Sequence, residues 1–311
     1  MPKNSLLSLL AIISLSGLVS CGGGAKYLKL QGSTMGTYYS VTYGEGESCS
    51  PQKKAVDNLL AQINSVMSTY ESDSELSLIN QNLQAGEYAI SQELHLVLGA
   101  SLTVWQETRG AFDVTIGPLV NLWGFGPTNA EETPTEFEQE AVAERIGMET
   151  LELASNSIVK KQPNLFIDLS AIAKGYAVDR VAEKLSSLGC KDYLVDIGGE
   201  SFAKGQNQAG TPWKIGIEVP SPERRGIQRV LALSDLAIAT SGDYRNFRET
   251  AVGRVSHVMD PRNKLPATSN IVSATVLHRS AMMADAYATS MMVLGYEDGM
   301  KLAEAQSIPV Y

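Results

Sequence analysis

"NLFIDLSAIAKGYAVDRVAEKL", residues 164–185, begins with the apolar pattern of a buried strand and ends with the periodicity of an amphipathic helix. Between the two lie an acid, Asp168, a hydroxyl, Ser170, and the pair Lys174 and Gly175. A strand, a short turn and a helix N-terminus together form an arrangement that binds phosphates, because free backbone N–H groups point at the ligand there. The stretch has neither a P-loop signature nor the G-x-G-x-x-G fingerprint. It therefore predicts a ligand-binding turn of another kind.

The rest of the chain alternates between helical and strand patterns. Helical periodicity predicts helices over residues 51–70, 91–110, 133–147, 171–189, 280–294 and 297–306. Alternating and β-branched runs predict strands over residues 37–44, 193–197, 213–219, 229–233, 237–240, 255–259 and 271–277. Helices dominate the first half and strands the second, so the pattern favours an α+β fold over a regular βαβ winding.

The N-terminus has the pattern of an export signal. Residues 1–20 carry one charge, Lys3, followed by an apolar run over residues 6–13 that is too short to span a bilayer. The sequence Leu-Val-Ser-Cys at residues 18–21 resembles a bacterial lipobox, in which Cys21 would be acylated. The prediction is a lipoprotein signal peptide over 1–20 and a lipid-anchored flexible tether over 21–31. An ordinary signal peptide with an incidental cysteine is the alternative.

Export would place the working domain on the periplasmic side of a bacterial membrane, inner or outer. Cys49 and Cys190 could pair in such an oxidising compartment, but their distance in sequence says nothing about geometry, and free thiols are the simpler expectation. The formal net charge of −9 argues against nucleic acid as the main partner. A bound polyphosphate would therefore need local neutralisation by a metal ion or by backbone N–H groups.

Five short stretches do not follow the packing pattern of helices and strands, and most of them lie at predicted strand ends. They are "STMGTYY" (33–39), "GAFDVTIGPLVNLWGFGP" (110–127), "VDIGGE" (195–200), "ATSGDYRNF" (239–247) and "SHVMDPR" (256–262). Any one of them alone reads as a structural turn. Because loops at strand ends commonly carry binding residues, the five together predict a shared cleft.

In combination these motifs resemble the ApbE family, the FAD:protein FMN transferases. The resemblance runs from about Gly32 to Gly295, nearly the whole mature chain. Its further motifs are Met-Ser-Thr-Tyr (67–70), Asp-Leu-Ser-Ala-Ile-Ala-Lys-Gly-Tyr (168–176) and Ala-Asp-Ala-Tyr-Ala-Thr (284–289). The resemblance implies mixed or antiparallel sheets flanked by helices in one large domain, residues 32–311. Members usually continue for another strand or two, so this chain is expected to be truncated or to lack a terminal strand.

The resemblance implies Mg²⁺-dependent transfer of FMN from FAD to a Thr hydroxyl of acceptor proteins, with AMP released. It also implies acceptors in membrane redox complexes, such as the sodium-pumping NADH:quinone reductase or related electron-transport subunits. Two other functions stay open on the sequence. One is a periplasmic FAD pyrophosphatase that makes AMP and FMN, and the other is a non-catalytic FAD-binding protein.

A magnesium site can be argued partly from the residues. Asp285 and Thr289 stand at positions i and i+4 of a predicted helix, so their oxygens leave one face. Mg²⁺ prefers hard oxygen ligands in an octahedral shell and keeps some waters. The resemblance implies Ala171 as the third protein ligand, through its backbone carbonyl.

The resemblance also implies most of the residues that contact FAD, whereas Lys174 and the catalytic base are inferred from position and residue chemistry. His257 is a candidate general base for the acceptor hydroxyl, because the pKa of histidine lies near neutral pH. Alternatively, His257 orients Asp260 or a phosphate, and Lys174 could be a solvated helix residue. The residues expected to contact FAD are Met35, Tyr70, Ala111, Phe112, Asp113, Asp168, Lys174 and Met259.

Overall fold

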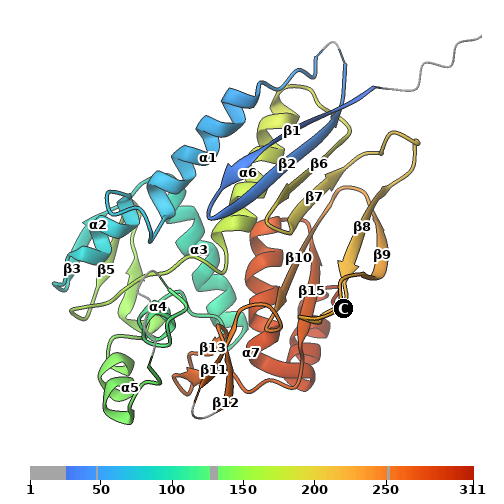
Figure 1. Cartoon of the computed structure of the whole chain (residues 1–311). Helices are drawn as coiled ribbons and strands as arrows, with labels where there is room; N and C mark the ends of the chain where they lie inside the picture. The colour runs from blue at the N-terminus through green and yellow to red at the C-terminus, as the bar shows by residue number, and fades with distance from the viewer. Residues whose placement is uncertain (1–25, 47, 127–131, 251–252) are drawn as a thin grey trace, which may run out of the picture.

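A computed structural model describes residues 26–46, 48–126, 132–250 and 253–311. Its centre is a six-stranded sheet in the order β1-β2-β6-β7-β10-β15, in which every pair of neighbours is antiparallel (Figure 1). The strands are β1 (Tyr27–Thr34), β2 (Thr37–Gly44), β6 (Tyr193–Ile197), β7 (Glu200–Lys204), β10 (Leu236–Gly242) and β15 (Ser273–His278). The α+β prediction is confirmed, with antiparallel pairing throughout the described sheets.

Helices cover one face of this sheet. They are α1 (Lys53–Met67), α6 (Ala173–Ser187) and α7 (Ala281–Gln306), with α3 (Gln92–Glu107) packed on α1 and α7 (Figure 1). Successive strand residues point to opposite faces, and in β2 the buried residues are accordingly Tyr39, Val41 and Tyr43. These side chains belong to the main core, together with the apolar stripes of the helices.

A hairpin covers part of the opposite face. It consists of β8 (Trp213–Glu218) and β9 (Ile227–Leu233), which stand beside the sheet in Figure 1. Trp213, Ile217 and Leu233 pack there against Ala203 of β7 and Ile238 of β10. Because Ala237 and Ala239 of the same strand β10 belong to the main core, the sheet is buried on both faces at this strand.

Shorter elements lie to the left of the sheet and below it in Figure 1. A small sheet has the order β3-β5-β4, and a second apolar core joins α4 and α5 to the β-hairpins that follow β10. The elements are α2 (Glu75–Gln81), β3 (Gly86–Ala89), α4 (Gly117–Leu122), α5 (Glu136–Ala143), η1 (Met148–Thr150), β4 (Leu151–Leu153), β5 (Ser157–Lys160), β11 (Phe247–Thr250), β12 (Gly253–Ser256), β13 (Met259–Asp260) and β14 (Leu265–Pro266).

Several predicted boundaries agree closely with the structure. The strands predicted over 37–44 and 193–197 are β2 and β6, and Ser91 and Ser280 cap α3 and α7 by accepting backbone N–H groups. The strand predicted over 255–259 is instead divided between β12 and β13. The two last helices form one element with a break at Gly295, whose φ of 75° is not helical.

The predicted tether is too long at its C-terminal end. Residues 27–31, which were assigned to it, already belong to β1. Leu28 and Leu30 pack against the main core, and the strand pairs with β2 along its whole length, which explains the difference. Cys21 and the predicted signal peptide lie outside the described residues. Within the described part of the chain, no helix is long and apolar enough to cross a membrane.

The last residues of the chain extend the sheet at β15. The backbone N–H of Thr275 donates to the carbonyl of Tyr311 at 2.8 Å, and the N–H of Tyr311 donates back to Thr275 at 2.9 Å. The bridge between Val276 and Val310 belongs to the same pairing. Residues 309–311 therefore occupy the edge beside β15.

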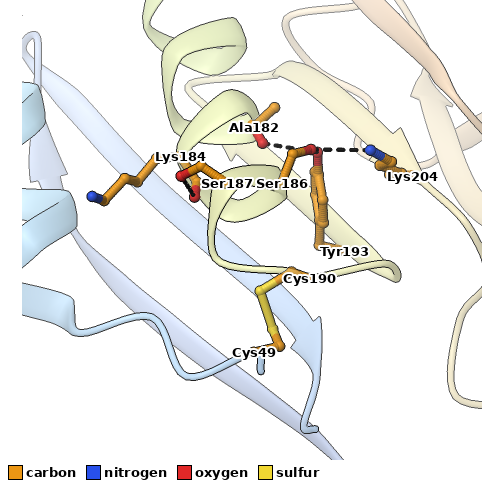
Figure 2. Close-up of a disulfide and its surroundings, with 8 residues drawn as sticks. All are labelled: Cys49, Ala182, Lys184, Ser186, Ser187, Cys190, Tyr193 and Lys204. Carbon is orange, nitrogen blue, oxygen red and sulfur yellow. Dashed lines mark hydrogen bonds between the residues drawn. A yellow bond between two sulfur atoms is a disulfide. The ribbon is translucent and has the colours of Figure 1, made fainter. Parts of the chain in front are cut away.

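The two cysteines of the described domain form a disulfide. Figure 2 shows Cys49, in the segment after β2, bonded to Cys190, just after α6. Their Cα atoms are 4.7 Å apart although 141 residues separate them in sequence. Both residues are buried in the main core. The sequence left this pairing open, because it depends on how β2 and α6 are placed in three dimensions.

Candidate active site

A cavity of about 400 Å³ lies where β10 ends, between α4, the first turn of α6, and α7. It brings together most of the residues singled out from the sequence, which lie far apart along the chain. Those that line it are Tyr70, Ala111, Phe112, Asp113, Asp168, Ala171, Lys174, His257, Met259, Asp285 and Thr289. Four of the five irregular stretches contribute lining residues, and the stretch at 33–39 does not, so the expected shared cleft is present in part.

Met35 does not lie among the residues that line this cavity. It occupies the tight turn between β1 and β2, where its φ of 50° is left-handed, and its side chain packs against the main core. The contact expected between Met35 and FAD therefore stays a prediction. The Thr-Met-Gly-Thr motif makes the turn that joins the first two strands.

The turn at residues 168–175 places the start of α6 against α7. Asp168 accepts hydrogen bonds from the backbone N–H and the hydroxyl of Ser170, which closes the turn. A Cβ on Gly175 would lie 2.2 Å from the carbonyl oxygen of Ala281, so only glycine allows this approach. The N–H of Gly175 donates to Oδ2 of Asp285 at 3.0 Å. The Lys-Gly pair thus joins α6 to the acid on α7.

Two buried acids and the partly exposed ammonium of Lys174 meet at this contact. Nζ of Lys174 lies 2.9 Å from Oε1 of Glu200 and 3.7 Å from Oδ1 of Asp285. Burial lowers the pKa of Lys174, but the carboxylates of Asp285 and Glu200 outweigh it and hold this pKa above its ordinary value. Burial raises the pKa of Glu200 to about 7, although Lys174 opposes this. Lys174 is therefore an ion-paired residue of the cavity and not a solvated helix residue.

Glu200 is a cavity residue to which the sequence analysis assigned no role. It is 4% exposed and begins β7, directly after the tight turn at Gly198 and Gly199, whose φ values are 65° and 112°. The signal was present in "VDIGGE", where an acid follows two glycines at a strand end. An acid in that position is as common in solvated turns, so its burial required the tertiary structure.

The residues expected to bind a metal are compatible with magnesium. Asp285 is 2% exposed, Thr289 lies one turn further along α7, and Ala171 lines the same cavity. The hydroxyls of Thr289 and Ser241 lie 3.2 Å apart. One carboxylate, one hydroxyl and one carbonyl are hard oxygen donors, which suit an ion that completes its shell with water and phosphate oxygens. Within the described residues, no group of three or more His, Cys, Asp or Glu side chains could hold a metal.

Asp113 lines the cavity, but its carboxylate is used to organise the surrounding loop. Oδ1 accepts hydrogen bonds from the backbone N–H and the hydroxyl of Thr115, both at 2.6 Å. Oδ2 accepts the backbone N–H of Met148 at 3.2 Å. Burial raises the pKa of Asp113, although these hydrogen bonds oppose it. Asp113 therefore joins the loop before α4 to η1.

His257 has the geometry of a proton acceptor. Nδ1 lies 3.1 Å from the carbonyl oxygen of Asn246, which can only accept, so Nδ1 carries the proton and Nε2 keeps its lone pair. Burial lowers the pKa of His257, which favours the neutral ring. The Asp260 carboxylate accepts from Nε and Nη2 of Arg262 at 2.9 and 2.7 Å, so Arg262 already orients it.

Apolar and aromatic side chains form the remaining walls. Phe112 and Met259 are buried, and Met259 belongs to the second core together with Leu119 and Trp123. Tyr70 is 68% exposed at the cavity, so its ring is available to a ligand. A flat aromatic ligand is favoured by such walls, whereas the charged groups on α6, β7 and α7 favour a ligand with phosphates.

The fold is that of flavin transferases of known structure. The flavin transferase ApbE from Vibrio cholerae superposes with a TM-score of 0.85 at 44% identity, covering 92% of this chain and 93% of that chain. The apo form of the Pseudomonas stutzeri flavinyl transferase ApbE gives a TM-score of 0.83 at 34% identity, covering 92% and 90% of the two chains.

Comparison of sequences leads to the same group of proteins. The sequence model of the ApbE family matches residues 35–311. The FAD:protein FMN transferase of Vibrio cholerae is 44% identical over 306 residues, which cover 97% of this chain and 92% of the relative. The transferase of the same name from Haemophilus influenzae is 39% identical, with 99% and 92% covered. The chain belongs to the ApbE family.

Proposed function

We propose that this protein is an FAD:protein FMN transferase, which moves FMN from FAD to a Thr hydroxyl of an acceptor protein and releases AMP. The observation that carries the proposal is the cavity, where His257, Lys174 and the oxygens of Asp285, Thr289 and Ala171 converge between apolar walls. The names of the relatives, which are similar over more than nine-tenths of this chain, favour the same activity.

The proposed reaction is a displacement at phosphorus. The acceptor hydroxyl oxygen bonds to the phosphorus of the FMN phosphate, and the bond from that phosphorus to the bridging oxygen of FAD breaks. AMP leaves with the bonding electron pair, and Nε2 of His257 accepts the hydroxyl proton. The walls formed by Phe112, Met259 and Tyr70 hold the flavin ring, which fixes the phosphorus beside the acceptor.

Magnesium is part of the proposal. Asp285, Thr289 and Ala171 would hold the ion, which supplies the neutralisation of the pyrophosphate that a protein with a net charge of −9 does not supply overall. Asp285 contributes the carboxylate, oriented by the N–H of Gly175. Lys174 adds a positive charge at the same end of the cavity.

We also propose that the protein is a periplasmic lipoprotein anchored through Cys21. The support is the lipobox pattern at residues 18–21 and the short apolar run before it. Such an anchor would hold the cavity near a membrane surface. Subunits of membrane redox complexes, including the sodium-pumping NADH:quinone reductase, are accordingly the proposed acceptors.

The test is a reaction of the purified protein with FAD, Mg²⁺ and candidate acceptor subunits. Transfer predicts that each acceptor gains the mass of one FMN group and that AMP forms in equal amount. An acceptor with its target Thr changed to Val is the control and should gain no mass. AMP and free FMN without acceptor modification would identify a pyrophosphatase, and bound FAD without AMP would identify a carrier. Either result would overturn the proposal.

A further inference from the structure

Lys174 lies between two buried carboxylates that differ in what else they bind. Oδ2 of Asp285 accepts the N–H of Gly175 at 3.0 Å, whereas Oδ1 lies 3.7 Å from Nζ of Lys174, beyond hydrogen-bond distance. Oδ1 is thus the oxygen of Asp285 that is available to a cation in the cavity. Lys174, with its own positive charge, competes with any such cation for that oxygen.

Glu200 binds Lys174 on the side away from Asp285. Its Oε1 lies 2.9 Å from Nζ of Lys174, closer than Oδ1 of Asp285 does. Its Oε2 is buried and has no hydrogen-bond partner among the residues that the structure describes. Leaving a buried carboxylate oxygen unpaired is unfavourable. The unpaired oxygen therefore offers Lys174 a second acceptor when another cation repels it from Asp285.

We infer that Glu200 is a positioning residue that holds Lys174 away from Asp285 and so keeps Oδ1 of Asp285 open to a divalent cation. The inference rests on the proposed magnesium site. Without the Glu200 carboxylate, Lys174 would have Asp285 as its remaining carboxylate partner, and an entering cation would have to displace it. With Glu200 in place, Lys174 stays paired with Glu200 when a divalent cation enters. The cation then binds the carboxylate of Asp285.

The experiment measures metal binding in the absence of FAD and acceptor. Mg²⁺ is titrated by calorimetry, and Mn²⁺ by loss of the free-ion paramagnetic resonance signal, at about pH 8, above the pKa of Glu200 near 7. The proteins are the unmodified chain, Glu200→Gln, Lys174→Met, the double variant and Asp285→Ala. Glu304→Gln, at an exposed position of α7, is the matched control.

Glu200→Gln should weaken binding of both ions by at least about fivefold, whereas Lys174→Met should strengthen it by a similar factor. In the Lys174→Met background, Glu200→Gln should change the dissociation constant of the metal by less than about threefold. With no Lys174 to position, the substitution removes only a negative charge that acts on the metal from a distance. Glu304→Gln should have no effect. If the effect of Glu200→Gln depends on Lys174, Glu200 acts by positioning Lys174. If it does not, Glu200 acts on the metal through its own charge.

Several results would overturn the inference. Equal weakening by Glu200→Gln in both backgrounds would make Glu200 a ligand or a distant charge, and no weakening would leave it without a role in metal binding. If Glu200→Gln alone fails to fold, Lys174→Met still has to strengthen binding for the inference to stand. An incorrect magnesium site would give a separate result: Asp285→Ala would then leave metal binding unchanged.

Discussion

At the scale of single residues, the proposed chemistry depends on a few oxygens and one ring nitrogen. Asp285 is the one carboxylate in the proposed ligand set, and its second oxygen is already oriented by Gly175. His257 is the one histidine among the residues that line the described cavity. His95 and His278 instead contact the backbone of Ala154 and Ser280. Substitutions at Asp285 and His257 should therefore have large and different effects.

Asp285→Ala should reduce FMN transfer by about 10³-fold or more, because a bound metal supplies several kcal/mol of transition-state stabilisation. The variant should keep some flavin, since the apolar walls remain, and high Mg²⁺ should restore activity only in part. Thr289→Val is the matched comparison and should be milder, because it removes one neutral ligand and keeps the shape. AMP release and flavin absorbance are measured together. Acceptor modification by Asp285→Ala at a near-normal rate would show that the proposed metal site is wrong.

His257→Ala should slow transfer by about 10² to 10⁴-fold with little change in FAD affinity, as expected for loss of a general base. A base must be neutral to accept a proton, and burial places the pKa of His257 below the ordinary value of 6.5. The rate of FMN transfer by the unmodified protein should thus be constant near neutral pH and fall only as the pH drops through that lowered pKa. A pH–rate profile measures this. A loss of FAD binding as large as the loss of rate would assign His257 to cofactor positioning instead.

At the scale of elements, the contact between α6 and α7 decides the geometry of the site. The first turn of α6 carries Lys174, the first half of α7 carries Asp285 and Thr289, and Gly175 lets the two helices approach. Asp179, further along α6, accepts the backbone N–H groups of Ala281 and Met282 and so satisfies the start of α7. The two helices are therefore connected by hydrogen bonds as well as by packing.

Gly175→Ala tests this contact. The added Cβ would meet backbone atoms of Ala281 and Met282, which cannot move without shifting α7. We expect a loss of about 1–3 kcal/mol in the free energy of unfolding, together with weaker Mg²⁺ binding because Asp285 is displaced. Chemical denaturation and calorimetry measure the two effects.

Gly99→Ala in α3 is the control, since its Cβ would lie in ordinary contact, 3.6 Å from a side-chain carbon of Leu153. Alanine is the better helix former, so this variant should be as stable as the unmodified chain or more so, by up to about 1 kcal/mol. Equal behaviour of the two variants would show that the close approach at Gly175 is not important.

At the scale of the whole molecule, the disulfide and the cavity lie at opposite ends of α6. The cavity lies at the first turn of the helix, and Cys190 follows its last turn (Figure 2). A helix of 15 residues is about 22 Å long. The bond between Cys49 and Cys190 should therefore act on stability and leave the chemistry unchanged.

Reduction of this disulfide should lower the free energy of unfolding by about 4–5 kcal/mol, because the bond closes a long loop in the unfolded chain. The rate of FMN transfer by the protein that remains folded should not change. Urea unfolding with and without a thiol reductant measures the effect. The double variant Cys49→Ala, Cys190→Ala is the control and should be insensitive to the reductant. An unchanged unfolding midpoint for the unmodified protein would contradict the prediction.

The proposed lipid anchor at Cys21 would hold the whole molecule at a membrane. Cys21→Ser should leave the protein soluble in the periplasm or with its signal peptide uncleaved, because no thiol remains to be acylated. Membrane fractionation with metabolic labelling by a fatty acid measures this. If the variant is still acylated and bound to the membrane, the lipobox assignment is wrong.

Much of the local structure could be predicted from the sequence, because its signals are local. The alternation in β2 and the N-caps Ser91 and Ser280 depend on residues within one or two turns of each other. The family resemblance and the chemistry of the residues together predicted that Asp285, Lys174 and His257 belong to one site, and these residues do line one cavity. The short elements β3, β4 and β5 were missed, since three or four residues carry too little periodicity.

By itself, then, the sequence determined the α+β class, the main helices and strands, and the family. The packing of distant segments was needed to establish that Cys49 pairs with Cys190 and that Glu200 shares Lys174 with Asp285. The physical reason is distance along the chain. Periodicity and capping depend on neighbouring residues, whereas a disulfide, a cavity wall or a buried ion pair depends on which distant segments the packed sheet brings together.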